Sequence, residues 1–404
     1  MKILFILPEL PYPLTTGVRV KCHSILLAAS GQHSCDIVSL GGEDITTAEQ
    51  LISEYLPNAS LLKILSPYKG WKLAYVKLIT LIKRRPTFFA RYSSRKIHST
   101  ISRVSSEGYD LIFIESFALV SYVSDVGGLP CVISITDALS ITYTHAAEES
   151  NNFLFGLYRW HQLGSVKRAE AFFLPEYAGI HVVSDFDSEY LKREYKGVEV
   201  FSISHIVPEE VINSFINSAH LIKKIEGKKN ILYSGRCSSD TLLNTLIDFV
   251  DKVYKPLSEL RLDMQLTILS GESSKEVLKN LSNDGSIVIK EWVENYELEL
   301  LNSDIIVFPD KSKCGVKTRL LYALASGKPI VATPEAIYGL PVHDGEHLIV
   351  RELGSKFVEA IQTLLDNEEL SVFLGQNALE LIQGPLSSDA HNHKWKGIFE
   401  KYVS

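Results

Sequence analysis

The sequence predicts an α/β protein with two doubly wound, Rossmann-like domains that face a central cleft. Short apolar, β-branched segments alternate with longer amphipathic segments, which is typical of parallel sheets covered by helices on both faces. The pattern occurs twice within 404 residues, a length that suits two α/β domains. Ligands of such sheets lie beyond the carboxyl ends of the strands. We therefore expect the functional residues on the loops that follow strands.

The two series of predicted strands are separated by a turn-like VPEE and a Lys-rich KKIEGKK, so the domain boundary is expected near residues 206–229. Helices are expected between the strands. The predicted strands are 2–7, 35–40, 110–115, 130–135 and 179–184, then 230–234, 265–270, 286–290, 304–308, 329–333 and 347–350; the predicted helices include 18–29, 184–195, 240–254, 273–281 and 317–326.

Composition excludes several classes of protein. The net charge of −7 argues against a general nucleic-acid binder. Five scattered cysteines form no CxxC pair or His/Cys cluster, which favours a reduced cytoplasmic protein over a disulfide framework or zinc site. The opening MKILFILPELPYP is interrupted too early for a signal peptide, and no uninterrupted apolar stretch is long enough to span a bilayer.

The loop after the first predicted strand, PELPYPLTTGVR, contains one glycine, Gly17. It lacks the GxGxxG of dinucleotide folds, and the chain lacks GxxxxGK[ST], so the dehydrogenase and NTPase interpretations lose their main support. Gly17 at a helix N-terminus would let a phosphate or sugar approach free N–H groups. An ordinary turn glycine explains it equally well.

The stretch DIIVFPDKSKCGVKTRLLYALASGKPIVATPEAIYGL is the most informative part of the sequence. Lys317 and Arg319 fall in the first turn of a predicted helix, where a cation opposes the helix dipole by up to about 1 kcal/mol, so an anion is expected beside them. Arg236, which follows Gly235 after another strand, suits bidentate phosphate recognition. Solvated surface cations remain the alternative. Together the three cations predict a diphosphate site.

Asp185, Phe186 and Asp187 match a DxD metal motif, but Ser184 before them is a good helix N-cap and the acids suit a first helical turn. We therefore predict no metal. GxSxG is absent, which weakens a hydrolase interpretation.

Residues 55–106 contain no Asp or Glu but eleven Lys and Arg. The segment 63–103 is predicted to lie on an anionic membrane surface; solvated basic helices with an apolar face in the core are the alternative.

These segments resemble family 4 of the glycosyltransferases, which are retaining enzymes with the GT-B fold. PYPLTTGVRVKCHSILLAA is similar to the family's first loop and helix, and ISITDALS with KRAEAFFLPEYAGIHVVSDFDSEYL is similar to its mid-domain stretch. ILYSGR and GVKTRLLYALASGKPIVATPEAIYGL resemble its donor-binding segments, and HKWKGIFEKYV resembles its terminal helix. The resemblance implies an acceptor-binding domain over 1–205, a nucleotide-sugar-binding domain over 206–385, and a helix over 386–404 that crosses back to the first domain.

The resemblance also implies roles for individual residues. Arg236, Lys317 and Arg319 would hold the donor diphosphate, with Gly235, Gly315 and Tyr322 beside the donor. Gly17 and Arg19 would lie against the transferred sugar or its phosphate. Asp137 and Glu115 would contact the acceptor, or else serve as helix caps and turn formers, and Asp137, Arg236 and Arg319 are the expected catalytic residues.

One departure concerns the family's Glu-x7-Glu motif, whose second Glu binds the nucleotide ribose. Cys314 and Tyr322 stand at the two positions. A phenol cannot accept two ribose hydroxyls as a carboxylate does. Either the donor is held differently, or its binding is weak, or activity has been lost.

The resulting expectation is a metal-independent, cofactor-free retaining glycosyltransferase. It would transfer a sugar from a nucleotide-diphosphate-sugar to a glycan or lipid-linked acceptor in surface polysaccharide synthesis. The alternatives are a catalytically impaired GT-B protein that binds a glycan or a partner subunit, a sugar-nucleotide epimerase of the same architecture, and transfer to modified DNA bases, against which the acidic charge argues.

Overall fold

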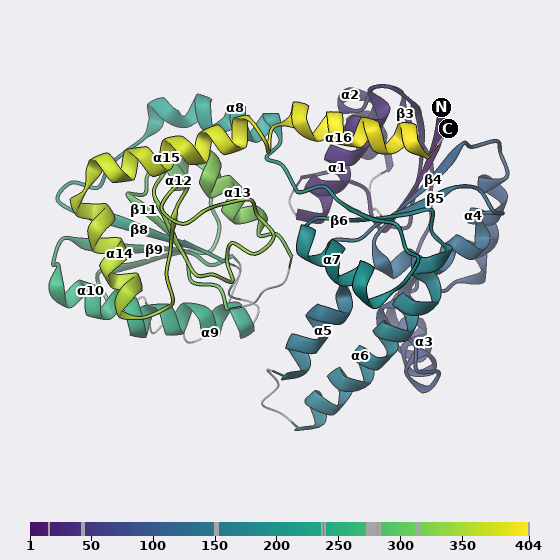
Figure 1. Ribbon diagram of the computed structural model, residues 1–404, viewed down its shortest axis with the longest axis horizontal. Coiled ribbons are helices and arrows are strands. Elements are labelled where there is room, and N and C mark those ends of the chain that lie inside the picture. The colour runs from purple at the N-terminus through teal and green to yellow at the C-terminus, as the bar shows by residue number, and fades with distance from the viewer. Residues whose placement is uncertain are drawn as a thin grey trace. The chain divides into compact units, whose positions relative to one another are not determined.

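The computed structural model describes residues 1–14, 17–41, 45–148, 153–235, 237, 240–271, 281, 284–311 and 315–402. The chain forms two compact units. Unit 1 comprises Met1–His205 together with Asp389–Ser404, and unit 2 comprises Ile206–Ser388. Each unit contains its own parallel sheet with helices packed against it (Figure 1).

Unit 1 has a seven-stranded sheet in the order β3-β2-β1-β4-β5-β6-β7, with every pair parallel. The central strands are buried on both faces, which explains their continuous apolar sequences. The direction of winding reverses between β1 and β4. The strands are β1 (Lys2–Leu7), β2 (Ser34–Ser39), β3 (Ala59–Ile64), β4 (Leu111–Glu115), β5 (Cys131–Ser134), β6 (Gly179–Val182) and β7 (Val200–Ser202).

Helices connect these strands. The α-helices of the first 205 residues are α1 (Gly17–Ser30), α2 (Ile45–Tyr55), α3 (Gly70–Ile82), α4 (Arg95–Ser105), α5 (Leu139–Glu148), α6 (Phe153–Phe173) and α7 (Asp185–Glu194), and the short 3-10 helices are η1 (Thr87–Tyr92), η2 (Phe117–Asp125) and η3 (Leu174–Glu176). Ser184 caps α7 by accepting a hydrogen bond from the Asp187 N–H, as the sequence predicts.

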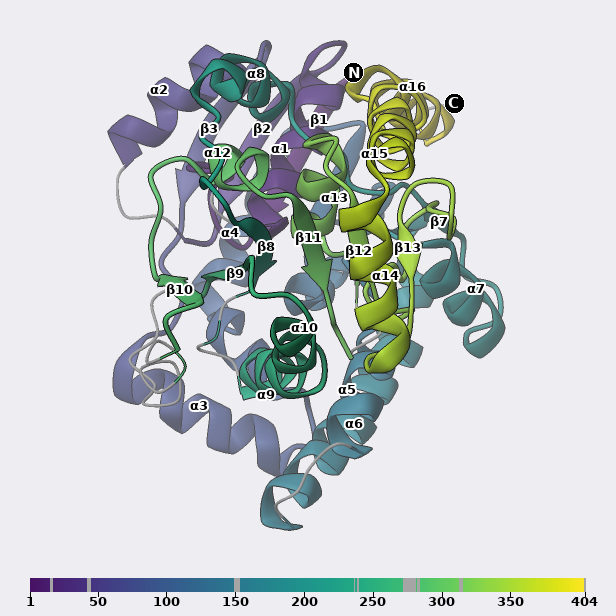
Figure 2. The ribbon, with the colours of Figure 1, turned by 90° about the vertical axis from the view of Figure 1, so that its left-hand side faces the viewer.

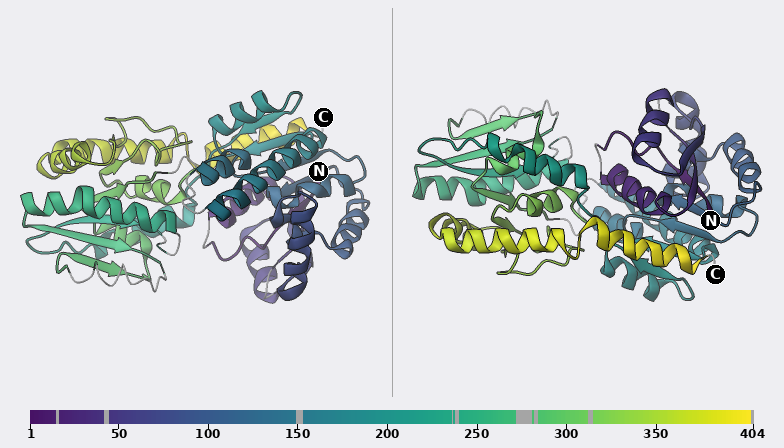
Figure 3. Two further views of the ribbon diagram at one scale, coloured as in Figure 1. Left: turned by 90° about the horizontal axis from the view of Figure 1, so that it is seen from below. Right: turned by 90° about the horizontal axis from the view of Figure 1, so that it is seen from above.

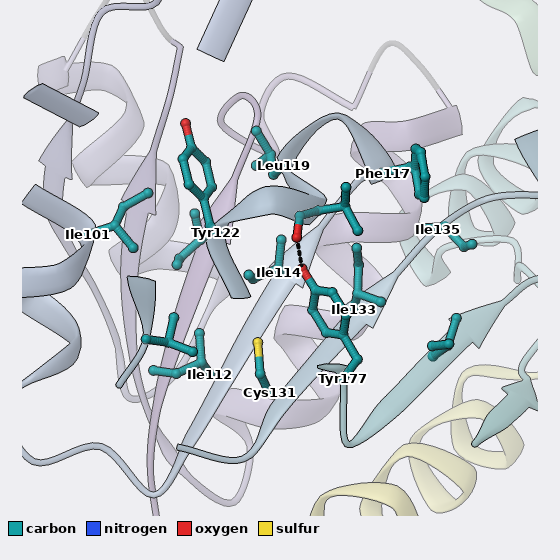
Figure 4. Packing of buried hydrophobic residues seen from close by; sticks show 14 of the residues in the cluster. Ile101, Ile112, Ile114, Phe117, Leu119, Tyr122, Cys131, Ile133, Ile135 and Tyr177 are labelled. Carbon is teal, nitrogen blue, oxygen red and sulfur yellow. Dashed lines mark hydrogen bonds between the residues drawn. The ribbon is translucent and has the colours of Figure 1, made fainter. Parts of the chain in front are cut away.

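One face of the unit 1 sheet packs a core that includes β4, β5 and η2 (Figure 4). Ile112, Ile114 and Ile133 lie next to Cys131 in this core. The phenol of Tyr177 is buried among them and donates a hydrogen bond of 2.8 Å to the Val120 carbonyl (Figure 4). The bond offsets the cost of placing a hydroxyl in an apolar core.

The opposite face of the unit 1 sheet is covered in part by α16 (Ser388–Lys401), which lies across this unit in Figures 1 and 3. Trp395 is fully buried, with its ring centroid 5.7 Å from that of Phe113 and 4.7 Å from that of His181. Its indole N–H donates to His391 Nε2 at 3.1 Å. The end of the chain therefore supplies part of the core of unit 1.

Unit 2 has a six-stranded parallel sheet in the order β10-β9-β8-β11-β12-β13, with a reversal of winding between β8 and β11. Helices lie on both sides of it (Figure 2). The strands are β8 (Lys229–Ser234), β9 (Met264–Leu269), β10 (Ile287–Lys290), β11 (Ile305–Phe308), β12 (Ile330–Ala332) and β13 (Ile349–Val350). The helices are α8 (Glu209–Ser218), η4 (Ala219–Leu221), α9 (Asp240–Phe249), η5 (Val250–Tyr254), α10 (Lys255–Leu260), α12 (Tyr296–Leu301), α13 (Thr318–Ala325), α14 (Ser355–Asp366) and α15 (Glu368–Gln383).

Two doubly wound, Rossmann-like units confirm the predicted fold class. The predicted strands are all present, while β3 and β7 are additional. The helix predicted from Lys317 begins one residue later, because Lys317 has extended backbone angles and occupies the N-cap position of α13. The helix predicted over 273–281 lies outside the described residues except for its last position. Among the described residues, no helix combines the length and apolar character needed to cross a bilayer.

Candidate active site

The carboxyl edge of the unit 2 sheet brings several predicted residues together where the winding reverses. Strand β8 ends at Ser234 and is followed by Gly235, and β11 is followed by Asp310. Arg319, on the first turn of α13, lies between these two strand ends. Ligands of open α/β sheets bind at such reversal points.

The guanidinium of Arg319 joins the two strand ends. Its Nη1 donates to the Ser234 carbonyl and its Nη2 donates to Asp310 Oδ1. Its charge also lies over the Phe308 ring, 5.5 Å from the centroid. The Asp310 side chain is 5% exposed and that of Arg319 is 19% exposed. A guanidinium has five N–H donors, so these two contacts fix the orientation of Arg319 and leave further donors for an anion.

Gly235 packs closely against this guanidinium. A Cβ at Gly235 would lie 2.8 Å from Arg319 Nη1 and 2.9 Å from the Tyr233 hydroxyl. A side chain at this position would therefore require the ends of the Arg319 and Tyr233 side chains to shift. Arg236 and Cys314, which the sequence places beside Gly235 and Gly315, lie outside the described residues.

Gly315 and Lys317 lie in the loop that immediately precedes α13. Gly315 has a φ of +55°, which favours glycine, and its carbonyl accepts a hydrogen bond of 3.4 Å from Lys317 Nζ. Lys317 thus lies immediately before the free N–H groups of α13. An anion placed there would meet both the ammonium and the positive end of the helix.

Tyr322 projects from α13 toward α12. Its ring centroid is 6.2 Å from that of Tyr296, whose hydroxyl lies 3.0 Å from Ser234 Oγ. Burial raises the pKa of Tyr322, and the nearby charge of Glu297 acts in the same direction, so the phenol stays neutral. Tyr322 is therefore connected through Tyr296 to the end of β8.

The carboxyl edge of the unit 1 sheet contains a cavity of ≈ 560 Å³, which we call the edge cavity. Loops that follow β1, β2 and β3 line it, together with α1 and η1. Arg19 lies in its wall and donates to Glu9 Oε2 at 2.8 Å and to the Pro13 carbonyl at 3.3 Å. Lys69 and Arg91 are two further cations of its lining. Gly17, the first residue of α1, begins the turn that carries Arg19.

Glu115 ends β4, beside the reversal of winding in unit 1, and is 1% exposed. Its Oε1 is 2.6 Å from Nζ of Lys21, which is equally buried and also donates to Thr136 Oγ1 at 3.3 Å. Burial raises the pKa of Glu115, and the charge of Lys21 opposes that rise. The Glu115 carboxylate is thus buried against Lys21 in this conformation, and its acceptor contact stays a prediction.

Asp137 lies at a second cavity of the same edge, the Asp137 cavity, of ≈ 270 Å³. Its Oδ2 accepts a hydrogen bond of 2.6 Å from Thr142 on α5. Ser116 lines the same cavity and has a φ of 87°, a conformation that costs a non-glycine residue free energy and often occurs at functional sites. Asp137 thus lies two residues before α5 with its carboxylate at a cavity, and its acceptor contact stays a prediction.

Asp185 and Asp187 are both occupied by local hydrogen bonds. Asp187 is buried, where it accepts from the Ala138 N–H at 3.0 Å and from the Ser184 hydroxyl, and Asp185 accepts from Ser202. Among the described residues, no group of three or more His, Cys, Asp or Glu side chains is placed to hold a metal.

Sequence reasoning missed Lys21, Ser116 and Asp310. Asp310 lies two residues after the end of the strand 304–308 and was available as a strand-end acid. Lys21 resembles a surface lysine, although α1 is apolar on most sides, which indicates a buried helix. Ser116 gives no sequence signal, because its backbone angle depends on the loop around it.

Residues 228–367 match the sequence profile of a protein family described as Glycosyl transferases group 1. A search of curated proteins finds no match to the sequence. Solved structures, in contrast, match nearly the whole chain.

Three of these structures illustrate the likeness. HepE of Anabaena, solved in complex with UDP, has a TM-score of 0.67 and 13% identity, with 99% of this chain and 100% of that chain covered. Sucrose-phosphate synthase of Thermosynechococcus elongatus has a TM-score of 0.68 and 15% identity, with 99% and 98% covered. A glycosyltransferase of Rickettsia africae has a TM-score of 0.64 and 14% identity, with 100% and 98% covered. At this identity, the likeness shows a shared fold, that of GT-B glycosyltransferases.

Proposed function

We propose that the protein is a retaining glycosyltransferase that moves a sugar from a nucleotide-diphosphate-sugar to a glycan or lipid-linked acceptor. The observation that carries the proposal is Arg319, held by Asp310 and Ser234 at the reversal point of the unit 2 sheet. This part of the chain lies within the stretch that matches the glycosyl transferase profile.

The donor diphosphate is assigned to Arg236, Lys317 and Arg319, with Gly235 and Gly315 allowing close approach of its oxygens. Arginine suits this role because its planar group binds phosphate oxygens in pairs. Tyr322 replaces the carboxylate that the resemblance leads one to expect and would pack against the nucleoside. UDP is the first nucleotide to test, because solved HepE structures contain UDP and UDP-glucose.

The acceptor is assigned to unit 1. Lys69 and Arg91 in the edge cavity favour an acceptor that carries an anionic group, and Asp137 would hold a hydroxyl through its carboxylate. Gly17 and Arg19, at the start of α1, stay assigned to the transferred sugar or its phosphate. A lipid-linked sugar or a growing surface polysaccharide fits this requirement. The proposed location is the cytoplasm, at the inner face of the membrane.

The mechanism uses charge stabilisation. As the bond between the sugar and the diphosphate lengthens, negative charge grows on the leaving phosphate, and pre-placed guanidinium and ammonium groups stabilise it. The leaving phosphate oxygen takes the proton of the acceptor hydroxyl, which attacks on the same face of the sugar. The new glycosidic bond therefore keeps the anomeric configuration of the donor, and the products are the glycoside and a nucleoside diphosphate.

Thermal unfolding of the full chain against five nucleoside diphosphates and their sugars, with a chelator present, tests the donor site. A shift specific to one base is expected, since a ligand that binds only the folded state raises stability. The anomeric configuration of the transferred sugar, read by NMR, then tests retention.

A catalytically impaired binding protein is the second candidate. It is favoured by Tyr322, which lacks the carboxylate expected for the ribose, and by the ion pair that already occupies Arg319. No shift with any nucleotide, combined with binding of a glycan to unit 1, would establish it. A nucleotide-dependent shift followed by release of nucleoside diphosphate only in the presence of an acceptor would exclude it.

A further inference from the structure

Helix α3 of unit 1 exposes a row of large apolar side chains. Trp71, Tyr75, Leu78 and Ile82 are 75%, 60%, 56% and 72% exposed. Their spacing places all four along one side of the helix, and Thr80 on the other side is buried. A contiguous apolar row of this kind on a protein surface marks an interaction site. We call these four residues the α3 row.

The charges around the α3 row are of one sign. Residues 55–106 contain eleven Lys and Arg and no Asp or Glu. Lys72 and Lys77 flank the row, and Lys69 and Lys83 stand at the two ends of the helix, all of them exposed. A helix with apolar residues on its outer side and lysines on its flanks is suited to lie in the surface of an anionic bilayer.

One end of α3 lies near α6 (Figures 1 and 2). Residues from the end of α3 and from α6 line a cavity of ≈ 380 Å³, which we call the α3–α6 cavity. Aromatic side chains, Phe89, Phe172 and Phe173, form much of its lining. Its cations are Lys83, Arg84, Arg85 and Arg168. An apolar lining with four positive charges matches a molecule that has both a phosphate and a hydrocarbon part.

None of these four cations forms an ion pair within the described part of the chain. Arg168 donates to two neutral acceptors, the Arg84 carbonyl at 3.0 Å and Ser165 Oγ at 3.2 Å. His98, which also lines the cavity, is bonded to Asp125 at 2.5 Å. The positive charge of the cavity is therefore not neutralised by the protein itself.

The backbone at Arg84 supports a role for its side chain. Arg84 has a φ of 53° at the end of α3, its N–H donates to the Leu81 carbonyl, and the Arg85 N–H donates to the Thr80 carbonyl. This is a Schellman ending, which favours glycine at the position of Arg84. An arginine is less favourable than glycine there, because its Cβ crowds the backbone in this left-handed conformation.

We propose that the α3 row enters the surface of an anionic membrane and that the α3–α6 cavity binds the phosphate of one anionic phospholipid. The lipid phosphate would contact the arginines, and the first carbons of its chains would lie against the phenylalanines. An anionic membrane suits this surface better than a second copy of the chain, because a second copy would place the same unneutralised cations against those of the first. The proposal holds or fails independently of sugar transfer.

Tryptophan emission of the full chain, measured with vesicles of phosphatidylcholine alone or with added phosphatidylglycerol, tests the α3 row. A blue shift is expected only with phosphatidylglycerol. Trp71→Phe is expected to keep vesicle binding in co-sedimentation but lose the shift, whereas Trp292→Phe, at an exposed tryptophan of unit 2, keeps both. A shift that survives in Trp71→Phe, or equal binding to both vesicles, would overturn the membrane contact.

Arg84→Gly tests the cavity without harming the fold, because glycine relieves the backbone conformation. Its thermal stability is expected to equal or exceed that of the native chain. Binding of monomeric dihexanoyl phosphatidylglycerol, followed by calorimetry, is expected to weaken about fivefold for the one charge removed. Lys77→Ala, on the same helix but outside the cavity, leaves this binding unchanged while weakening vesicle binding.

Equal affinity of Arg84→Gly and the native chain for the short-chain lipid would remove the cavity from the proposal. A Tyr75→Ser/Leu78→Ser variant is expected to lose vesicle binding without a change in molecular mass in solution. If the native chain is instead a dimer that this variant converts to a monomer, and neither binds vesicles, the row is a contact between copies and the proposal is wrong.

Discussion

Arg319 and Asp310 form an ion pair in which the aspartate, 5% exposed, is more deeply buried than its partner. The pair connects the end of β11 to the first turn of α13, and the same guanidinium reaches the Ser234 carbonyl at the end of β8. Its orientation is therefore set before any ligand arrives, as electrostatic stabilisation of a leaving group requires.

Arg319→Ala is expected to abolish transfer, but it also leaves Asp310 buried without its partner. We expect a loss of about 2 kcal/mol in the free energy of unfolding, as for a broken charge-assisted hydrogen bond. Arg319→Met combined with Asp310→Asn should recover most of that stability while remaining inactive. Urea unfolding and release of nucleoside diphosphate measure the two effects. An active double variant would remove Arg319 from the donor site.

Gly235→Ala should weaken donor binding through Arg319. The new Cβ would meet Arg319 Nη1 at 2.8 Å, so the guanidinium or the loop must move, at a cost of about 1 to 3 kcal/mol in stability. Gly285→Ala in the same unit is the matched control, because a Cβ there meets no atom within 4 Å. Nucleotide titration and thermal unfolding of both variants check the prediction. If both variants bind the nucleotide equally and unfold at the same temperature, the close contact between Gly235 and Arg319 does not affect donor binding.

Lys21→Met should cost about 3 to 5 kcal/mol of stability, because it leaves the buried Glu115 carboxylate uncompensated. Without Lys21 the pKa of Glu115 rises further above its unfolded value. The variant should therefore gain stability as pH falls through that raised pKa, since its folded state then binds a proton that the unfolded state releases. Urea unfolding at neutral and mildly acid pH measures this. Lys21→Met/Glu115→Leu should be close to the native chain in stability at both pH values.

His391 should make the folding of unit 1 sensitive to acid. Burial lowers its pKa to about 4, and its Nε2 accepts the indole N–H of Trp395, which a protonated ring cannot do. The unfolded state, with a pKa near 6.5, binds a proton first, so stability present at neutral pH is lost as pH falls from about 6.5 toward 4. His391→Gln, which keeps an acceptor, should exceed the native chain by about 2 kcal/mol near pH 4.5. Burial and, to a smaller degree, the charge of His391 lower the pKa values of His181 and His205, so the substitution also relieves part of their acid sensitivity.

The central strands of both sheets were predictable because burial on both faces leaves continuous apolar sequences such as that of β1. Strand β3 was missed because it lies at the sheet edge and is half exposed, and β7 because it has three residues. The positions of Gly235 and Asp137 after strands, and that of Arg319 in the first turn of a helix, were predictable from the sequence. The partnership of Arg319 with Asp310 and that of Lys21 with Glu115 depend on how separate loops meet, which no local pattern encodes.

Trp395 has a consequence for the order of events during synthesis. The strands it covers lie within the first 205 residues, yet the tryptophan emerges from the ribosome after all of unit 2. At ordinary elongation rates the delay is roughly 10 to 40 s. During that time Phe113 and Phe201 lack their aromatic cover, whereas unit 2, one continuous stretch of chain, is free to finish folding. We therefore expect unit 1 of the nascent chain to need protection by a chaperone until α16 has been synthesised.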